Sequence, residues 1–212
     1  SNDISNSLIE FKRLYFSEIT EEDAKELSQL IDYYSKKVFD DELYLFDYTL
    51  AVNNLSTYYA FKKDYSKSID LYEKAIDLLN SSNTFSNDGD QILFLYDRLL
   101  GISNLFSPDN IITYLSPILE IIKKNNLDSS LRATSIYTNI GKGLSLLGNK
   151  EDSYFYLFKA LRNEEMDEDR SNIYPLIINY LIENYLTEKN FSQIEILIDQ
   201  LNIYKDKNYY SK

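Results

Sequence analysis

The chain has 212 residues, which is enough for one sizeable domain or one continuous array of repeats. Hydrophobic residues make up 44% of it, and glycine (5) and proline (3) are scarce, a composition that favours long helices over turn-rich sheets. The net charge of −12 opposes binding to phosphate backbones and anionic lipids, and the absence of Cys and His excludes disulfides, zinc sites and catalytic relays built on thiol or imidazole.

These properties predict a protein that is not an enzyme, holds no metal or cofactor, and does not itself bind nucleic acid or a membrane. Apolar runs are all shorter than the roughly 18 residues of a membrane span, and no signal segment opens the chain, so we expect a cytoplasmic protein. Because the chain begins with Ser1-Asn2 rather than Met, we also expect a fragment of a longer protein.

The first helical pair is expected near residues 4–38. Thr20 to Asp23 has the pattern of a capping box, and Ala24, Leu27 and Ile31 follow at helical spacing. The sequence therefore predicts that a helix begins directly after Thr20.

Two segments further along the chain share one pattern at a fixed offset. The small or turn-forming residues of the first are Ser56, Asp64, Ser68 and Ala75, and their counterparts 85 residues later are Gly141, Asn149, Ser153 and Ala160. Two antiparallel helices explain the pattern, because small residues let the helices approach closely. The pattern resembles the tetratricopeptide repeat without its Trp and its final Pro, and it predicts pairs near 42–80 and 131–163.

The offset leaves room for another pair near 91–124. There, Ser107-Pro108 predicts an N-cap followed by Pro in the first turn, and Pro117 predicts a kink. A last pair is expected near 172–204, with its turn at Lys189-Asn190-Phe191. The predicted fold is all-α, a right-handed superhelix of about five tetratricopeptide-like helical pairs that forms a single domain over residues 1–212.

The first helix of each pair lines the inner wall of such an array. The repeat offsets align a mainly polar set of positions on these helices, namely Glu10, Asn54, Asp97, Asn139 and Tyr180. Amide side chains on an inner face can bond the backbone of an extended peptide, since each carries donors and an acceptor. The alternative is that these polar residues merely face water.

Other motifs favour ordinary structural interpretations. Gly141-Lys142-Gly143 lacks the spacing of a phosphate-binding loop and falls inside a predicted helix. Asp88-Gly89-Asp90 and the stretch from 164 to 169 lack the alternating ligands of a calcium loop, so both are interpreted as solvated loops. No pair of carboxylates is distinguished as a catalytic acid and base.

The block from Glu42 to Phe46 follows a Tyr-rich helix, and together with the expected architecture it resembles the repeat domain of Rgg and PlcR-type peptide-responsive transcription regulators. The resemblance implies a short signalling peptide in a concave groove, a homodimer, and a separate N-terminal helix-turn-helix domain for DNA. It carries peptide binding to Asn53, Asn54, Asn139 and Asn179, and less directly to Arg98, Thr138 and Lys142. Tyr180 is a further predicted peptide contact because of its place among the aligned inner positions.

Our leading hypothesis is thus a peptide-sensing regulatory domain. The alternative is a tetratricopeptide-repeat scaffold or co-chaperone-like module that docks a protein partner. For the homodimer, the sequence predicts an interface at the C-terminal pair, where apolar residues exceed what one neighbouring repeat can cover. These residues are Ile177, Ile178, Leu181, Ile194, Ile198 and Leu201.

Overall fold

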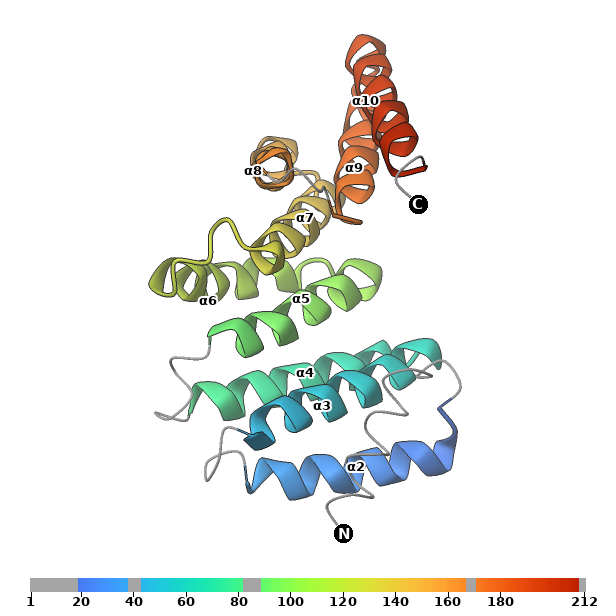
Figure 1. The fold of residues 1–212 in the computed structure, drawn as a ribbon. Helices are drawn as coiled ribbons and strands as arrows, with labels where there is room; N and C mark the ends of the chain where they lie inside the picture. The colour runs from blue at the N-terminus through green and yellow to red at the C-terminus, as the bar shows by residue number, and fades with distance from the viewer. Residues whose placement is uncertain (1–18, 38–42, 82–88, 167–170, 210–212) are drawn as a thin grey trace. The chain divides into compact units, whose positions relative to one another are not determined.

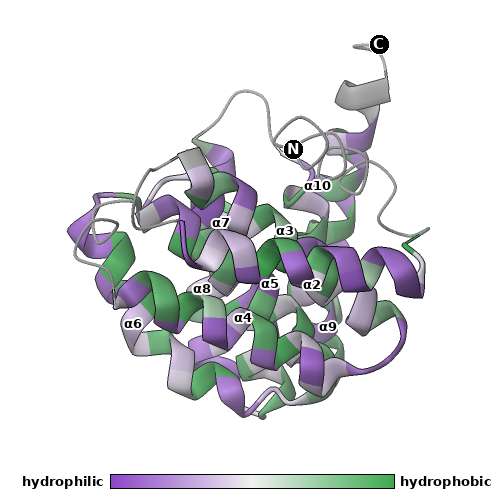
Figure 2. Ribbon diagram, turned by 90° about the horizontal axis from the view of Figure 1, so that it is seen from below, coloured by the Kyte–Doolittle hydropathy of each residue, from purple (hydrophilic) through white to green (hydrophobic). Residues whose placement is uncertain are grey.

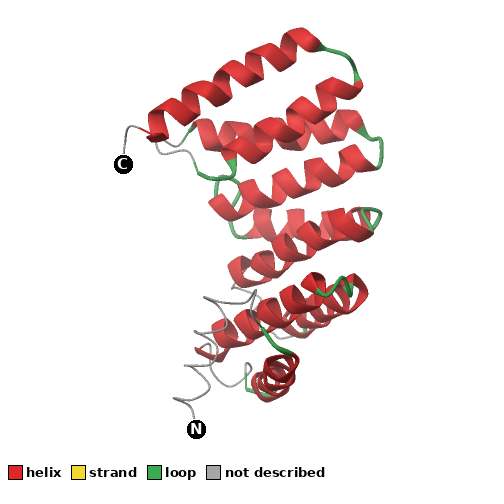
Figure 3. Cartoon of the chain, turned by 90° about the vertical axis from the view of Figure 1, so that its right-hand side faces the viewer, coloured by secondary structure: helices red, strands yellow, loops and turns green. Residues whose placement is uncertain are grey.

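The structure, a computed structural model, describes residues 19–37, 43–81, 89–166 and 171–209. Within these residues all regular structure is helical, as Figure 3 shows, and nine helices are formed. The all-helical expectation is confirmed. Contacts divide the chain into two compact units, Ser1–Asn126 and Leu127–Lys212, which are described separately.

The first unit contains five of the helices, shown in Figure 1. They are α2 (Glu21–Ser35), α3 (Leu43–Phe61), α4 (Tyr65–Asn80), α5 (Gly89–Phe106) and α6 (Asn110–Lys124). Helix α3 packs against α2, α4 and α5, and α5 packs in turn against α4 and α6. Because α3 is covered on three sides, apolar residues occur all around it rather than along one stripe.

The start of α2 matches its predicted cap. The Thr20 hydroxyl accepts a hydrogen bond from the Asp23 backbone N–H at 3.2 Å, and the Asp23 carboxylate accepts one from the Thr20 N–H at 2.8 Å. This capping box orients the helix so that Ala24 and Leu27 pack against α3 residues, among them Ala51 and Leu55.

The second unit contains α7 (Leu131–Leu146), α8 (Lys150–Glu165), α9 (Tyr174–Thr187) and α10 (Phe191–Tyr209). Helix α7 packs against α8 and α9, and α9 packs against α10. At the α7–α8 contact, a Cβ added to Gly141 would meet Leu157 Cγ at 2.6 Å, and the Ser153 hydroxyl donates to the Gly141 carbonyl at 2.7 Å. The predicted role of small residues in close helix packing is confirmed at this contact.

Three pairs share the same turn between their two helices. Its penultimate residue has a positive φ, which is 61° at Lys63, 80° at Gly148 and 57° at Lys189. The next residue caps the second helix in two of them, with Asp64 and Asn149 side chains accepting from backbone N–H groups three residues on. These are the turns that the sequence predicts.

Helix α6 begins later than predicted. The expected N-cap was Ser107 with Pro108 in the first turn, but the helix starts at Asn110. The Ser107 carbonyl accepts from the Asn110 N–H at 3.1 Å, so Pro108 and Asp109 occupy a turn before the helix. Pro117 lies inside α6, as expected.

Hydrophobic and hydrophilic positions alternate around the helices, as Figure 2 shows. The predicted C-terminal dimer surface is largely interior: Ile177, Ile178 and Leu181 are 0% exposed and Ile194 is 8% exposed. Ile198, by contrast, is 44% exposed. Most of this set therefore packs inside the second unit, and the homodimer itself stays a prediction.

Candidate functional site

One face of the second unit joins α7 to α9 through charged and aromatic side chains. Lys142 of α7 forms an ion pair with Glu183 of α9, and its ammonium lies 4.8 Å from the centre of the Tyr180 ring. The Lys142 side chain is 22% exposed and that of Glu183 is 53% exposed. Burial, with a smaller effect of the Glu183 charge, raises the pKa of the Tyr180 phenol. The phenol therefore stays neutral and a hydrogen-bond donor at physiological pH.

Two amides lie next to this cluster. Asn139 precedes Lys142 by three residues on α7, which places both on one face of the helix, and Asn139 is partly exposed. Asn179 directly precedes Tyr180 on α9 and is exposed. Four predicted residues are thus carried by two helices that pack together. We call Asn139, Lys142, Asn179, Tyr180 and Glu183 the α7–α9 face.

Thr138 does not belong to this face. It is 1% exposed, and its hydroxyl donates to the Thr134 carbonyl at 2.8 Å within α7. A hydroxyl that bonds its own helix and is covered by neighbours cannot contact a ligand. The prediction of Thr138 as an accessible peptide contact conflicts with this burial.

A buried polar network connects α7, α8 and α9, and it was not predicted from the sequence. Asn184 is 0% exposed, its amide N–H donates to Ser153 at 2.8 Å, and its carbonyl accepts from Ser145 and from Lys150. The spacing of Asn184, seven residues after Ile177 and three after Leu181, places it on the buried stripe of α9. That spacing was the available signal.

In the first unit, Asn53 and Asn54 point to different environments. Asn53 is partly exposed and accepts a hydrogen bond from the Tyr72 hydroxyl at 3.0 Å. Asn54 is 1% exposed, and its amide nitrogen has no hydrogen-bond partner among the described residues. The expectation that Asn54 lies on an exposed face is wrong, because α3 is enclosed by three other helices.

Arg98 remains accessible on α5. Its guanidinium lies 5.5 Å from the centre of the Phe94 ring, and its side chain is exposed, whereas the neighbouring Asp97 is buried. Burial raises the pKa of the Tyr72 phenol, and the Arg98 charge is among the smaller effects that oppose this rise. Of these two neighbours, only Arg98 is accessible to a ligand.

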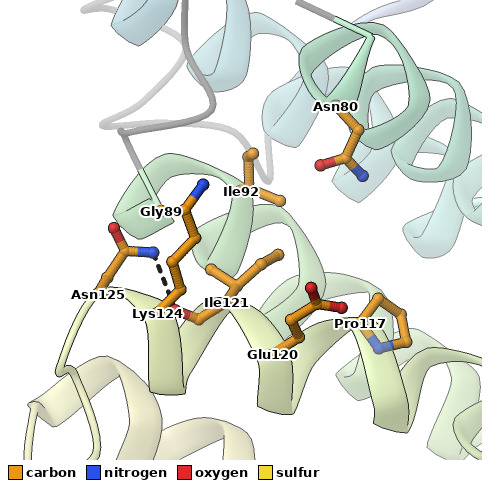
Figure 4. A pocket seen from close by; sticks show the side chains of 8 residues that line it. All are labelled: Asn80, Gly89, Ile92, Pro117, Glu120, Ile121, Lys124 and Asn125. Carbon is orange, nitrogen blue, oxygen red and sulfur yellow. Dashed lines mark hydrogen bonds between the residues drawn. The ribbon is translucent and has the colours of Figure 1, made fainter. Parts of the chain in front are cut away.

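A pocket of about 290 Å³ lies in the first unit, and none of the residues predicted to bind peptide lines it (Figure 4). It is lined by Asn80, Gly89, Ile92, Pro117, Glu120, Ile121, Lys124 and Asn125, from α4, α5 and α6. The hydrogen bond drawn in the figure lies at the C-terminal end of α6, where the Asn125 side-chain amide donates to the Ile121 carbonyl at 2.9 Å. The lining shows no convergence of polar groups on one point, so the pocket is a weaker candidate than the α7–α9 face.

Several predicted positions lie outside the described residues, namely Glu10, Glu42, Asp88 and the stretch 167–169. Among the residues that are described, no group of three or more acidic side chains could hold a metal ion. None of the described helices is both long and apolar enough to cross a membrane.

No protein-family model matches the chain, and no curated protein matches it. Among solved structures it is similar to the crystal structure of BtubC (BKLC) from P. vanneervenii, with a TM-score of 0.70 and 17% sequence identity. The match covers 82% of this chain and 68% of that one. At such low identity the similarity concerns the helical fold.

Proposed function

We propose that this chain is a peptide-binding helical-repeat module whose recognition surface is the α7–α9 face. The observation that supports it is the set of accessible polar groups that α7 and α9 present together. The set consists of two side-chain amides and of Lys142, which contacts the Tyr180 ring and the Glu183 carboxylate. Asn139 and Asn179 offer donors and acceptors to the backbone of an extended segment. Tyr180 offers an apolar ring with a polar tip to a side chain.

The wider proposal is a regulatory domain of a cytoplasmic, peptide-responsive transcription regulator. In it the helical pairs continue as a right-handed superhelix of about five tetratricopeptide-like units, the protein is a homodimer, and a separate domain binds DNA. The support is the sequence resemblance around Glu42 to Phe46 and the repeated pair geometry, including the shared turns at Lys63, Gly148 and Lys189. No catalytic role is proposed.

A second candidate function is a scaffold that docks a folded partner. It is favoured by exposed apolar side chains where α3 and α5 end: Phe61 is 62%, Leu105 71% and Phe106 56% exposed. The Phe106 ring packs on Tyr65 with centroids 5.6 Å apart. Such exposed apolar residues suit a broad protein surface better than a peptide backbone.

The two functions are separated by screening an array of random seven-residue peptides with the 212-residue chain and titrating the best binders by calorimetry. Asn139→Ala and Asn179→Ala should each weaken binding by about 1 to 3 kcal/mol, the cost of leaving a bound amide without a partner. The losses should be similar for peptides of different sequence, because backbone contacts carry little side-chain information.

The matched control is Asn202→Ala, which changes another exposed amide, on α10, and should leave affinity and helix content unchanged. Unchanged affinity in both α7–α9 variants would show that the recognition surface is elsewhere. If no peptide binds, and Phe106→Ser abolishes the binding of a folded protein partner, the scaffold function is the correct one.

A further inference from the structure

Helices α4 and α8 are related by the repeat offset and provide an internal comparison. Both contain 16 residues, and each follows the same turn with a side-chain cap at Asp64 or Asn149. Their buried residues correspond: Ser68 with Ser153, Tyr72 with Leu157 and Ala75 with Ala160. Differences between the two helices are therefore not dictated by the pair fold.

The exposed faces of the two helices differ in chemistry. Helix α4 carries Asp70 and Glu73, which are exposed. At the matching positions α8 carries Phe155 and Phe158, whose exposed fractions are 61% and 44%. Since α4 shows that charged residues suit these positions, the two phenylalanines are not needed to fold the pair. Large apolar side chains kept exposed on a helix indicate a contact surface.

Charges flank the phenylalanines on the same stripe of α8. Glu151 lies four residues before Phe155, and Arg162 lies four residues after Phe158, so both continue the exposed face. Both are exposed, and neither forms an ion pair within the described part of the chain. We call Glu151, Phe155, Phe158 and Arg162 the α8 stripe.

The α8 stripe is self-complementary. The midpoint between Phe155 and Phe158 is also the midpoint between Glu151 and Arg162. A two-fold axis through that midpoint would place Phe155 against Phe158 of a second copy, and Glu151 against Arg162 of the second copy. An isologous interface requires such a pattern, in which residue i contacts j and j contacts i. On α4 the corresponding stripe is Ser66, Asp70, Glu73 and Asp77, which would set like charges against each other.

We propose that the α8 stripe is the surface through which two copies of this chain associate, with the two α8 helices packed antiparallel. The proposal rests on the homodimer included in the proposed function and names its surface. A crossing angle near the 20° class is required, because Glu151 and Arg162 are about 16 Å apart along the helix and a steeper crossing would separate the ends.

The association is weak. An aromatic side chain buries about 150–250 Å² when fully covered, so the four partly exposed rings supply only roughly 400 Å² of the contact. Stable dimers bury about 1,200 Å² or more in total. The dimer should therefore form and dissociate reversibly as the protein concentration changes.

Sedimentation equilibrium of the full chain from about 1 µM to 1 mM tests the surface. The double variant Phe155→Asp/Phe158→Glu installs the residues of α4 and should be monomeric throughout with unchanged helix content. Glu151→Arg should weaken the dimer roughly tenfold or more, because two like-charge contacts replace two ion pairs. Arg162→Glu should do the same, and combining Glu151→Arg with Arg162→Glu should restore the Kd to within about threefold.

The matched control is Phe191→Asp, which changes an equally exposed phenylalanine on α10, and the dimer should survive it. A dimer lost in this control but kept in the α8 double variant would overturn the α8 surface while the homodimer stands. If the wild-type chain stays monomeric to 1 mM, the proposal that the α8 stripe binds a second copy of the chain is overturned. Peptide titration of the monomeric variant keeps the two proposals separate, since the α7–α9 face is unchanged in it.

Discussion

Backbone conformation at single residues distinguishes two glycines that look alike in the sequence. Gly148 has a φ of 80°, in a region that side chains disfavour, whereas Gly101 lies inside α5 and a Cβ there would meet no atom within 4 Å. Gly148→Ala should lower the free energy of unfolding by about 1 kcal/mol. Gly101→Ala should raise it by about 0.5 to 1 kcal/mol, because alanine is the better helix former.

Urea denaturation followed by circular dichroism measures both effects in parallel. The opposite signs are the informative result, since both variants add the same methyl group. A loss of stability in both variants would mean that the open space beside Gly101 is absent in solution.

Predictions for single residues succeeded where the residue type and its position on the helix indicated the same role. Thr20 as a cap and Gly141 as a close-contact residue follow from local spacing alone. It failed at Asn54 and Thr138, where polar chemistry was given more weight than position. Asn54 lies three residues after the buried Ala51, a spacing that places it on the packed side of α3.

At the scale of helices, the buried network around Asn184 ties α7, α8 and α9 together. Asn184→Ala should cost about 2 to 3 kcal/mol, because it leaves the Ser145 and Ser153 hydroxyls and the Lys150 ammonium without this partner in a covered site. The control is Asn179→Ala on the exposed side of the same helix, which should change stability by less than about 0.5 kcal/mol. Equal effects of both variants in thermal unfolding would show that the network contributes nothing.

The helix pairs themselves were predictable because the apolar spacing and the turn residues agree. The start of α6 was not, because Ser107-Pro108 fits both a helix cap and the turn that the structure contains. The α7–α9 face was predicted in part: the aligned offsets indicated Asn139 and Tyr180, but the bonding of Lys142 to Glu183 depends on how neighbouring helices pack.

For the molecule as a whole, tyrosine hydroxyls bonded to carboxylates recur in both units. Tyr114 donates to Glu73 at 2.5 Å, Tyr137 to Asp128 at 2.5 Å and Tyr154 to Glu188 at 3.0 Å. In each case burial is the main cause that raises the phenol pKa above its ordinary value of 10.0, and the neighbouring carboxylate adds to it. In two of the three cases the bond joins residues that are 41 or 34 positions apart in the sequence.

Stability should therefore fall at alkaline pH. Below about pH 10 the phenols are protonated in both the folded and the unfolded chain, so their contribution is fully present. Above it the unfolded chain loses protons that the folded chain keeps, and the free energy of unfolding decreases as the pH rises towards the folded pKa values. Urea denaturation at pH 8, 9, 10 and 11 measures this, with a smaller decline in Tyr137→Phe. Constant stability through pH 11 would contradict it.

The division into two compact units was not foreseen in the sequence, which predicts one domain over 1–212; that single domain stays a prediction. Sequence periodicity reports which residues face a neighbouring helix, and it carries no information on how strongly successive pairs contact each other.

The tyrosine–carboxylate bonds also bear on the intrinsic fluorescence of the protein. The chain has 20 tyrosines and no tryptophan, so its ultraviolet emission comes from tyrosine alone. An excited phenol is a stronger acid than in its ground state, and a carboxylate bonded to it quenches its fluorescence. These three bonds should therefore lower the tyrosine emission of the folded protein. Release of Tyr114, Tyr137 and Tyr154 on unfolding should raise the emission, which gives an optical signal of folding that needs no attached dye.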